Sequence, residues 1–158
     1  MKSKGFEKQI VMVRHAHRDT SERESDNGLS QKGLEQVGTL VKAYRSGDLP
    51  KGRYFFSSPK KRCQETLKPL SELARAPFEI ANSLDEKQGS ETENQFLHRI
   101  DDYLTEIKKL CDKDSVIYIC SHGDLIPVAI DLLTGRYVEV EKGKAVRLIY
   151  YGRHWTLL

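Results

Sequence analysis

Two arginines and two histidines follow an apolar run near the start of the chain. The run 10–13 reads as a buried strand, and the residues after it include Arg14, His15, His17 and Arg18. Cationic and imidazole side chains packed at one strand end repel one another unless a negatively charged group lies among them. A bound anion is therefore the simplest explanation for this cluster.

Residues of the same kind recur where two later apolar runs end. The run 54–57 continues into SSPKKR, which contains Arg62, and the run 115–120 continues into SHGD, which contains His122. In parallel α/β sheets, ligands bind beyond the carboxyl ends of the strands, where helix N-termini point. The recurrence at three strand ends predicts one positively charged site built from all three.

The elements that would position this site alternate between strands and helices. We expect strands at 9–14, 54–57, 78–81 and 115–120, and a C-terminal pair at 138–140 and 145–151. Helices are expected to begin after Ser30, after Ser58 with Pro59 in the first turn, after a Ser90–Glu93 capping box, and near Asp124. This order predicts a single α/β domain over residues 1–158, with a mostly parallel sheet.

Taken together, these motifs resemble the histidine phosphatase superfamily, the group that includes the cofactor-dependent phosphoglycerate mutases. RHAHR, SSPKKRCQET and SHGD follow three strands in that family's order, and GLSQKGLEQV is similar to its first helix. The resemblance extends from about Ile10 to Leu133. It implies a phosphoglycerate mutase-like fold, a three-layer α/β/α domain with a reduced lid, most like the short phosphohistidine phosphatases.

The resemblance implies roles for five side chains. His15 would be the nucleophile that takes the phosphoryl group as a phosphohistidine, and Arg14, Arg62 and His122 would surround the phosphate. Arg18 matches a third arginine found in the acid-phosphatase branch. The chemistry agrees, because nearby cations favour the neutral imidazole that can attack, and a carbonyl that accepts from Nδ1 would leave Nε2 free.

The proton donor for the leaving oxygen has two candidates. The mutase branch places a glutamate just after the third strand, where this chain has Glu86, and the acid-phosphatase branch places an aspartate directly beside the second histidine. Asp124 is separated from His122 by Gly123, so we favour Glu86. Ala16 also departs from the family pattern, which has glycine after the nucleophile, and its Cβ would resist a positive φ.

The short chain bears on the type of reaction. Only one helix fits between Glu86 and Ser115, where the mutases insert a long lid. An open pocket admits water and bulky substrates, which favours a phosphatase acting on phosphomonoesters, phosphoproteins or phosphoramidates. Phosphoglycerate mutase-type transfer and a non-catalytic phospho-ligand binding module are the alternatives.

A metal site is the rival interpretation from another class. His15 and His17 have the spacing of two metal ligands on one strand face, as in metal-dependent amidohydrolases. That reading needs a much larger barrel and further ligands after later strands, and this chain offers only His122 and Asp124. We therefore expect no metal and no cofactor.

Composition argues against several other classes of protein. The formal net charge of +3 over 158 residues is small and scattered, which argues against nucleic-acid binding. No apolar run reaches the ~20 residues of a membrane span and the start lacks a signal-peptide core, so we expect no membrane association and a cytoplasmic location. Cys63, Cys111 and Cys120 lack metal-ligand spacing and read as reduced thiols. The expected partner is a phosphorylated small molecule or a phosphoprotein, and the sequence makes no prediction of oligomeric state.

Overall fold

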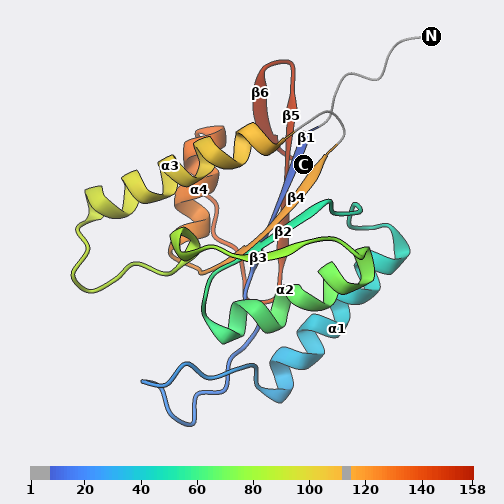
Figure 1. The fold of residues 1–158 in the computed structure, drawn as a ribbon, viewed down its shortest axis with the longest axis vertical. Coiled ribbons are helices and arrows are strands. Elements are labelled where there is room, and N and C mark those ends of the chain that lie inside the picture. Colours follow the sequence, from blue (N-terminus) through green and yellow to red (C-terminus); the bar gives the residue numbers. More distant parts are fainter. Residues whose placement is uncertain (1–7, 112–114) are drawn as a thin grey trace.

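The computed structural model describes residues 8–111 and 115–158, whose ribbon is drawn in Figure 1. Strands and helices alternate through most of this part of the chain, as expected. Their order is β1 (Lys8–Arg14), α1 (Gln31–Ser46), β2 (Tyr54–Ser57), α2 (Lys61–Ala74), β3 (Phe78–Ile80), the 3-10 turn η1 (Asn82–Leu84), α3 (Glu93–Leu110), β4 (Val116–Ser121), α4 (Leu125–Thr134), β5 (Ala145–Tyr151) and β6 (His154–Leu157).

The strands form one sheet in the order β3-β2-β4-β1-β5-β6. The first four of these are parallel to one another, whereas β5 runs antiparallel to β1 and β6 antiparallel to β5. Helices α1 and α2 lie on one side of the sheet, and α3 and α4 lie on the other (Figure 1). The expected α/β/α architecture with a mostly parallel sheet is confirmed.

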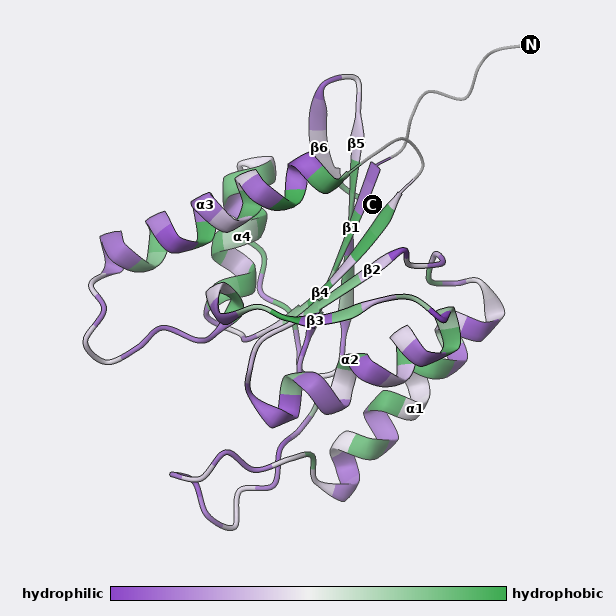
Figure 2. Ribbon diagram, viewed as in Figure 1, coloured by the Kyte–Doolittle hydropathy of each residue, from purple (hydrophilic) through white to green (hydrophobic). Residues whose placement is uncertain are grey.

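Alternate residues of β1 face the two helical layers. Ile10 and Met12 belong to the hydrophobic cluster that includes α3 and α4, whereas Val11 and Val13 belong to the cluster that includes α1 and α2. Neighbouring residues of a strand point to opposite sides of the sheet, so a strand covered on both faces requires an uninterrupted apolar run. In Figure 2, β4 is likewise hydrophobic along most of its length, whereas the helices mix hydrophobic and hydrophilic residues.

The expected start of α1 is confirmed and that of α2 is wrong. The Ser30 side chain accepts a hydrogen bond from the Gly33 amide and caps α1. At α2, Lys60 rather than Ser58 occupies the N-cap position. The Ser58 hydroxyl accepts from the Lys60 amide at 3.3 Å and is also bonded to Nε2 of His122, at 2.8 Å. Ser58, which the sequence pattern predicts as a helix cap, thus also holds the ring of His122 in the loop after β4.

The capping box of α3 lies two residues later than expected. Thr92 and Gln95 form it, each side chain bonding the backbone amide of the other. Ser90 and Glu93 have the same three-residue spacing, but Ser90 lies in a turn and Glu93 is already the first helical residue. Both pairs satisfy the sequence pattern, so only the path of the preceding loop decides between them.

The C-terminal hairpin pairs β5 with β6, so the strand expected at 138–140 is wrong. Gly152 and Arg153 form the connecting turn, and both have positive φ angles, as a two-residue hairpin turn of this hand requires. Residues 138–140 lie outside any strand. The carbonyl of Val140 instead accepts from Nη1 of Arg14, at 2.9 Å. This segment therefore holds the side chain of Arg14, the last residue of β1.

The parallel strands β1, β2 and β4 end at the same edge of the sheet. Arg14 lies opposite Ser121, and Ser57 lies opposite Cys120. The loops that follow these strands are consequently neighbours in space, as their sequence motifs predicted. Over residues 8–111 and 115–158, none of the helices is both long enough and apolar enough to cross a membrane.

Candidate active site

Two histidine rings meet at this edge of the sheet. The ring centroids of His15, after β1, and His122, after β4, are 5.3 Å apart. Backbone hydrogen bonds carry the sheet pairing beyond the strands, from the His15 amide to the Ser121 carbonyl and from the Ser58 amide to the Cys120 carbonyl. The three loops are thus held in register by the strands that precede them.

One ring nitrogen of His15 is hydrogen-bonded to the backbone and the other is free. Nδ1 lies 2.8 Å from the carbonyl oxygen of Ala16, and a carbonyl can only accept, so Nδ1 carries the proton and Nε2 keeps its lone pair. The side chain is buried, with 6% of the residue exposed. Burial, together with the positive charges of Arg62 and Arg14, lowers the pKa of His15 to about 4, although the bond to Ala16 acts in the opposite direction. The ring is therefore neutral near pH 7.

The loop that carries His15 is fastened to α2 through Thr66. The Ala16 amide donates to Oγ1 of Thr66 at 2.9 Å, and the same hydroxyl donates to the carbonyl of Arg62 at 2.6 Å. Ala16 does not adopt a positive φ, because Arg75 and Arg153 alone do so among the described non-glycine residues. Alanine in place of the family's glycine is therefore compatible with this loop. Thr66 was not singled out from the sequence, which contains no local sign of this contact.

His122 is held between a serine and an arginine. Its Nδ1 lies 3.4 Å from Nη2 of Arg62, which can only donate, and its Nε2 lies 2.8 Å from Oγ of Ser58. Nδ1 is therefore the acceptor and Nε2–H donates to the hydroxyl. Burial, followed by the charge of Arg62 and the neighbouring His15 ring, lowers the pKa of His122 to about 2. The site thus contains two neutral imidazoles among cations.

Two guanidinium groups border the histidines, and each has a donor without a protein acceptor. In the described part of the chain, Nε of Arg14 and Nε of Arg62 are buried and make no hydrogen bond. Arg14 passes close to the backbone of Gly123, where an added Cβ would lie 2.6 Å from its Cζ atom. Glycine at the start of the α4 turn therefore leaves room for this side chain. A buried donor without an acceptor is costly, so the two free Nε–H groups favour an anionic ligand.

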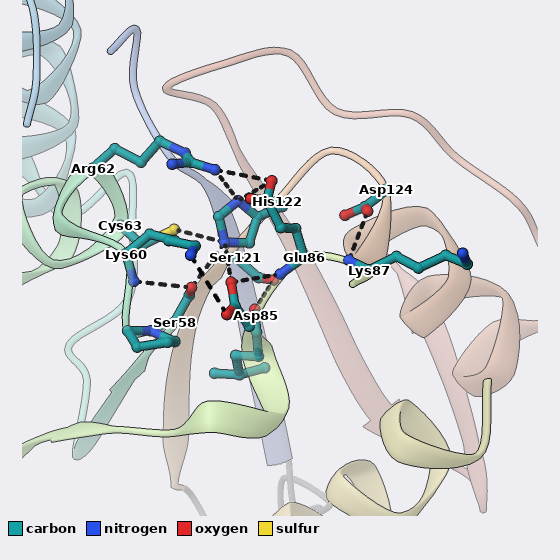
Figure 3. A network of polar contacts seen from close by, with 12 residues as sticks. Ser58, Lys60, Arg62, Cys63, Asp85, Glu86, Lys87, Ser121, His122 and Asp124 are labelled. Atoms are coloured by element: carbon teal, nitrogen blue, oxygen red, sulfur yellow. Dashed lines mark hydrogen bonds and ion pairs between the residues drawn. The ribbon is translucent and has the colours of Figure 1, made fainter. Parts of the chain in front are cut away.

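Carboxylates from the loop after η1 complete the group (Figure 3). Oε2 of Glu86 lies 2.9 Å from Nη2 of Arg62 and 3.9 Å from Nδ1 of His122. Oδ1 of Asp85 lies 3.7 Å from Nε2 of His122, and Lys60 lies 3.8 Å from the other Asp85 oxygen. The Glu86 side chain is 41% exposed, so it borders the site from the solvent side. Asp85 was not named from the sequence, although it directly precedes Glu86.

Three residues considered from sequence make their contacts elsewhere. Oδ2 of Asp124 accepts from the Lys87 amide at 3.0 Å, and Figure 3 places this pair apart from the histidine and its carboxylates. Nη2 of Arg18 donates to the carbonyl of Arg23 at 2.7 Å. Nδ1 of His17 lies 2.7 Å from the Ser30 hydroxyl. The structure therefore brings together Arg14, His15, Arg62, Glu86 and His122, and leaves Arg18 outside this group.

The metal interpretation finds no support in the side-chain arrangement. His17 is engaged with Ser30 rather than paired with His15. Within residues 8–111 and 115–158, no three histidine, cysteine, aspartate or glutamate side chains are grouped so that they could hold a metal ion. The cluster at the strand ends is one of cations and neutral rings, which suits an anion.

Comparisons with known structures agree on the fold. The α-ribazole phosphatase of Shigella flexneri superimposes with a TM-score of 0.80 at 16% identity, covering 95% of this chain and 94% of that one. A phosphoserine phosphatase mutant of Entamoeba histolytica, in complex with phosphoserine, gives 0.76 at 12% identity with 94% of both chains covered. A mycobacterial glucosyl-3-phosphoglycerate phosphatase, in complex with VO3, gives 0.75 at 16% identity, covering 95% and 97%.

Sequence comparison gives a family assignment. None of the curated proteins matches the chain at a significant level. The family model of the histidine phosphatase superfamily (branch 1) matches residues 10–95, just over half of the chain and the part that includes Arg14, His15, Arg62 and Glu86. This protein belongs to the histidine phosphatase superfamily.

Proposed function

We propose that this protein is a metal-independent phosphatase that works through a phosphohistidine on His15. The observation that carries the proposal is the free Nε2 of a neutral, buried His15, set among two guanidinium groups that have unused donors. A nucleophile needs a lone pair, and a phosphoryl group needs donors around its equatorial oxygens. Arg14, His15, Arg62 and His122, which we call the proposed phosphate pocket, supply both.

In the first step, Nε2 of His15 attacks phosphorus, a P–N bond forms and the P–O bond to the leaving group breaks. At rest Glu86 is a carboxylate paired with Arg62; a phosphomonoester monoanion that takes its place at Arg62 passes its proton to Glu86. The leaving oxygen then takes this proton from the Glu86 carboxyl, which becomes a carboxylate again. Arg14, Arg62 and His122 donate hydrogen bonds to the phosphoryl oxygens and so stabilise the negative charge on these oxygens in the transition state. His122 can do so through its Nε2–H, which the Ser58 hydroxyl accepts when no ligand is bound.

In the second step, water attacks the phosphohistidine. The Glu86 carboxylate takes a proton from the water, the P–N bond breaks and its electrons return to Nε2 of His15. Glu86 passes this proton to the product, inorganic phosphate leaves, and both residues return to the protonation states they had before substrate bound. Glu86 is preferred over Asp124 as the acid and base because it contacts Arg62 and lies near His122, whereas Asp124 is bonded to the Lys87 amide.

The proposed substrates are phosphomonoesters, phosphoproteins or phosphoramidates. Phosphatases with the same fold include proteins described as acting on phosphoserine and glucosyl-3-phosphoglycerate, which supports a phosphorylated small molecule. Mutase-type transfer is less well supported, because only the short segment 85–92 separates η1 from α3. We expect so short a segment to leave the phosphoenzyme open to water, which favours hydrolysis.

Hydrolysis of p-nitrophenyl phosphate in excess EDTA tests this function. Wild-type activity should persist with EDTA, and His15→Ala should lose at least about a thousandfold, because covalent catalysis is removed. Wild-type protein quenched during turnover should carry acid-labile phosphate, which His15→Ala should lack. Activity lost to EDTA would revive the metal mechanism. A wild type that binds orthovanadate but hydrolyses no phosphoprotein or sugar phosphate would be a binding module.

A further inference from the structure

The proposed acid is carried by a loop without regular secondary structure. We define the acid loop as residues 85–92, between η1 and α3. Within it, the side chain of Glu86 is 41% exposed and its ion pair is made to Arg62, a residue of the proposed phosphate pocket. A carboxyl that must deliver a proton to a leaving oxygen needs a fixed position, and a loose loop does not provide one.

Arg99, in the second turn of α3, donates hydrogen bonds to the backbone at the start of this loop. Its Nη1 donates to the carbonyls of Ser83 at 2.7 Å and Asp85 at 2.9 Å, and its Nη2 donates to the carbonyl of Glu86 at 3.3 Å. Three successive contacts thus fix the backbone on both sides of Asp85. The planar guanidinium suits this task because its donors have a rigid geometry.

The far end of the loop is held by the same guanidinium. Nε and Nη2 of Arg99 each lie 2.8 Å from an oxygen of Glu91, a bidentate pair. Glu91 also accepts from the Gln88 amide at 3.2 Å, and the Gln88 side chain donates to the carbonyl of Glu86 at 2.7 Å. Hydrogen bonding from Arg99 lowers the pKa of Glu91 to about 2, so this carboxylate stays charged at neutral pH. Both ends of the acid loop are therefore hydrogen-bonded to the same arginine.

The guanidinium itself is anchored to the core. Phe96 and Ile100, from the same helix, are buried in the cluster beneath α3, and the Arg99 guanidinium lies 5.1 Å from the Phe96 ring centroid. Only 20% of the Arg99 side chain and 14% of the Glu91 side chain are exposed. The position of Glu86 is therefore set relative to a packed helix rather than by the loop alone.

We propose that Arg99 and Glu91 are positioning residues that hold Glu86 where it can protonate the leaving group. The proposal rests on the proposed phosphatase function, and neither residue needs to touch substrate. Their contribution should appear in proton transfer to poor leaving groups and not in phosphate binding. This separates them from Arg14 and Arg62, which face the anion.

The test compares two substrates that differ in leaving group. p-Nitrophenol leaves without protonation, whereas the alcohol of β-glycerol phosphate requires a proton. Glu86→Gln sets the reference and should lower kcat/KM, which reports the step that expels the leaving group, at least about tenfold more for β-glycerol phosphate than for p-nitrophenyl phosphate. Arg99→Met and Glu91→Gln should show the same selectivity to a smaller extent, about three- to tenfold, with KM nearly unchanged, and Arg99→Lys should fall between wild type and Arg99→Met.

A matched control and a second readout separate positioning from general damage. Lys109→Met breaks an exposed ion pair with Glu106 on the same helix and should leave both kcat/KM values unchanged. Hydrogen exchange at the amides of residues 85–90 should accelerate in Arg99→Met and Glu91→Gln while exchange in β1 and β4 stays slow. If Arg99→Met does not fold, Glu91→Gln carries the test, because it keeps the guanidinium and the carbonyl contacts.

The outcomes distinguish this inference from the proposed function. An active wild type in which Glu86→Gln is selective but Glu91→Gln and Arg99→Met are not would overturn the positioning role alone. Equal losses on both substrates, or unchanged exchange at 85–90, would also overturn it. A wild type without phosphatase activity would instead overturn the function on which the inference rests. Matching selectivity in Glu86→Gln, Arg99→Met and Glu91→Gln, with faster exchange in Arg99→Met and Glu91→Gln, supports it.

Discussion

The arginines at the proposed phosphate pocket and the arginine under the acid loop are bonded in different ways. Every nitrogen of the Arg99 guanidinium has an acceptor, either a loop carbonyl or the Glu91 carboxylate. Arg14 and Arg62 each use some of their donors on the protein and leave a buried Nε without a partner. All three lie near the same edge of the sheet, so their surroundings differ more than their location.

This difference separates an arginine that supports structure from one that awaits a ligand. A saturated guanidinium stabilises the fold because its buried donors are satisfied, whereas a buried donor without an acceptor costs stability. The cost is offset when an anion such as phosphate enters the pocket. Changes in the pocket should therefore affect ligand binding more than folding, and changes at Arg99 should do the reverse.

Replacing Arg62 should give the largest effect and test this contrast directly. We expect Arg62→Met to lower kcat/KM for p-nitrophenyl phosphate by at least about a hundredfold, because a donor to the transition state is lost. Orthovanadate should no longer raise the melting temperature of this variant, whereas Arg99→Met should retain that response. If vanadate stabilises both variants equally, the distinction between the two kinds of arginine is wrong.

A methyl group at Gly123 should have an intermediate effect. Gly123→Ala places a Cβ 2.6 Å from Cζ of Arg14, so the guanidinium must move and its bond to Val140 must weaken. We expect KM for p-nitrophenyl phosphate to rise about tenfold, since weakening one charged hydrogen bond costs about 1.5 kcal/mol. Gly38→Ala, in α1, is the control, because no heavy atom lies within 4 Å of the added Cβ there. Equal KM values in the two variants would contradict the close packing of Arg14.

Acid should weaken the fold through the two buried histidines, the smallest of the three effects. Burial and nearby cations lower the pKa of His15 to about 4 and of His122 to about 2, against about 6.5 for an unperturbed histidine. At a pH between about 6.5 and the lowered pKa of each histidine, that histidine binds a proton in the unfolded chain but not in the folded chain. The free energy of unfolding should therefore fall as pH drops below about 6.5, by up to about 1.4 kcal/mol per pH unit for each histidine.

Urea denaturation between pH 7 and pH 5 measures this slope. His15→Asn should reduce it by about half, because one of the two titrating groups is removed. His154→Gln, at an exposed position, should leave it unchanged. A free energy of unfolding that does not vary over this range would show that the rings are not held neutral.

The residues that sequence reasoning found share a local signal, and those it missed do not. Arg14 ends β1, and His15 and His122 directly follow β1 and β4, where polar residues of this kind are conspicuous. Thr66 and Arg99 sit inside helices, and nothing beside them in sequence indicates their roles. Thr66 contacts a residue 50 positions away, and Arg99 reaches carbonyls up to 16 positions away. Contacts of this kind depend on how loops close, which periodicity and motif spacing do not encode.

Errors in the predicted elements have the same origin. Residues 138–140 contain two valines with strand-like alternation, yet the carbonyl of Val140 is bonded to Arg14. Ser58 has the pattern of a helix cap, yet Lys60 is the N-cap of α2, and the Ser58 hydroxyl bonds His122 as well as the Lys60 amide. In both cases a local preference worth about 1 kcal/mol gives way to a charged or buried partner supplied by the fold.

The sequence by itself determined the layered α/β architecture and the edge where the site lies. Uninterrupted apolar runs require strands covered on both faces, and parallel strands must end together. Only the tertiary structure decided which nitrogen of His15 is free, which donors of Arg14 and Arg62 lack partners, and which arginine holds the acid loop. These properties depend on distances of about 3 Å between residues far apart in sequence, because hydrogen bonds and desolvation act only at contact.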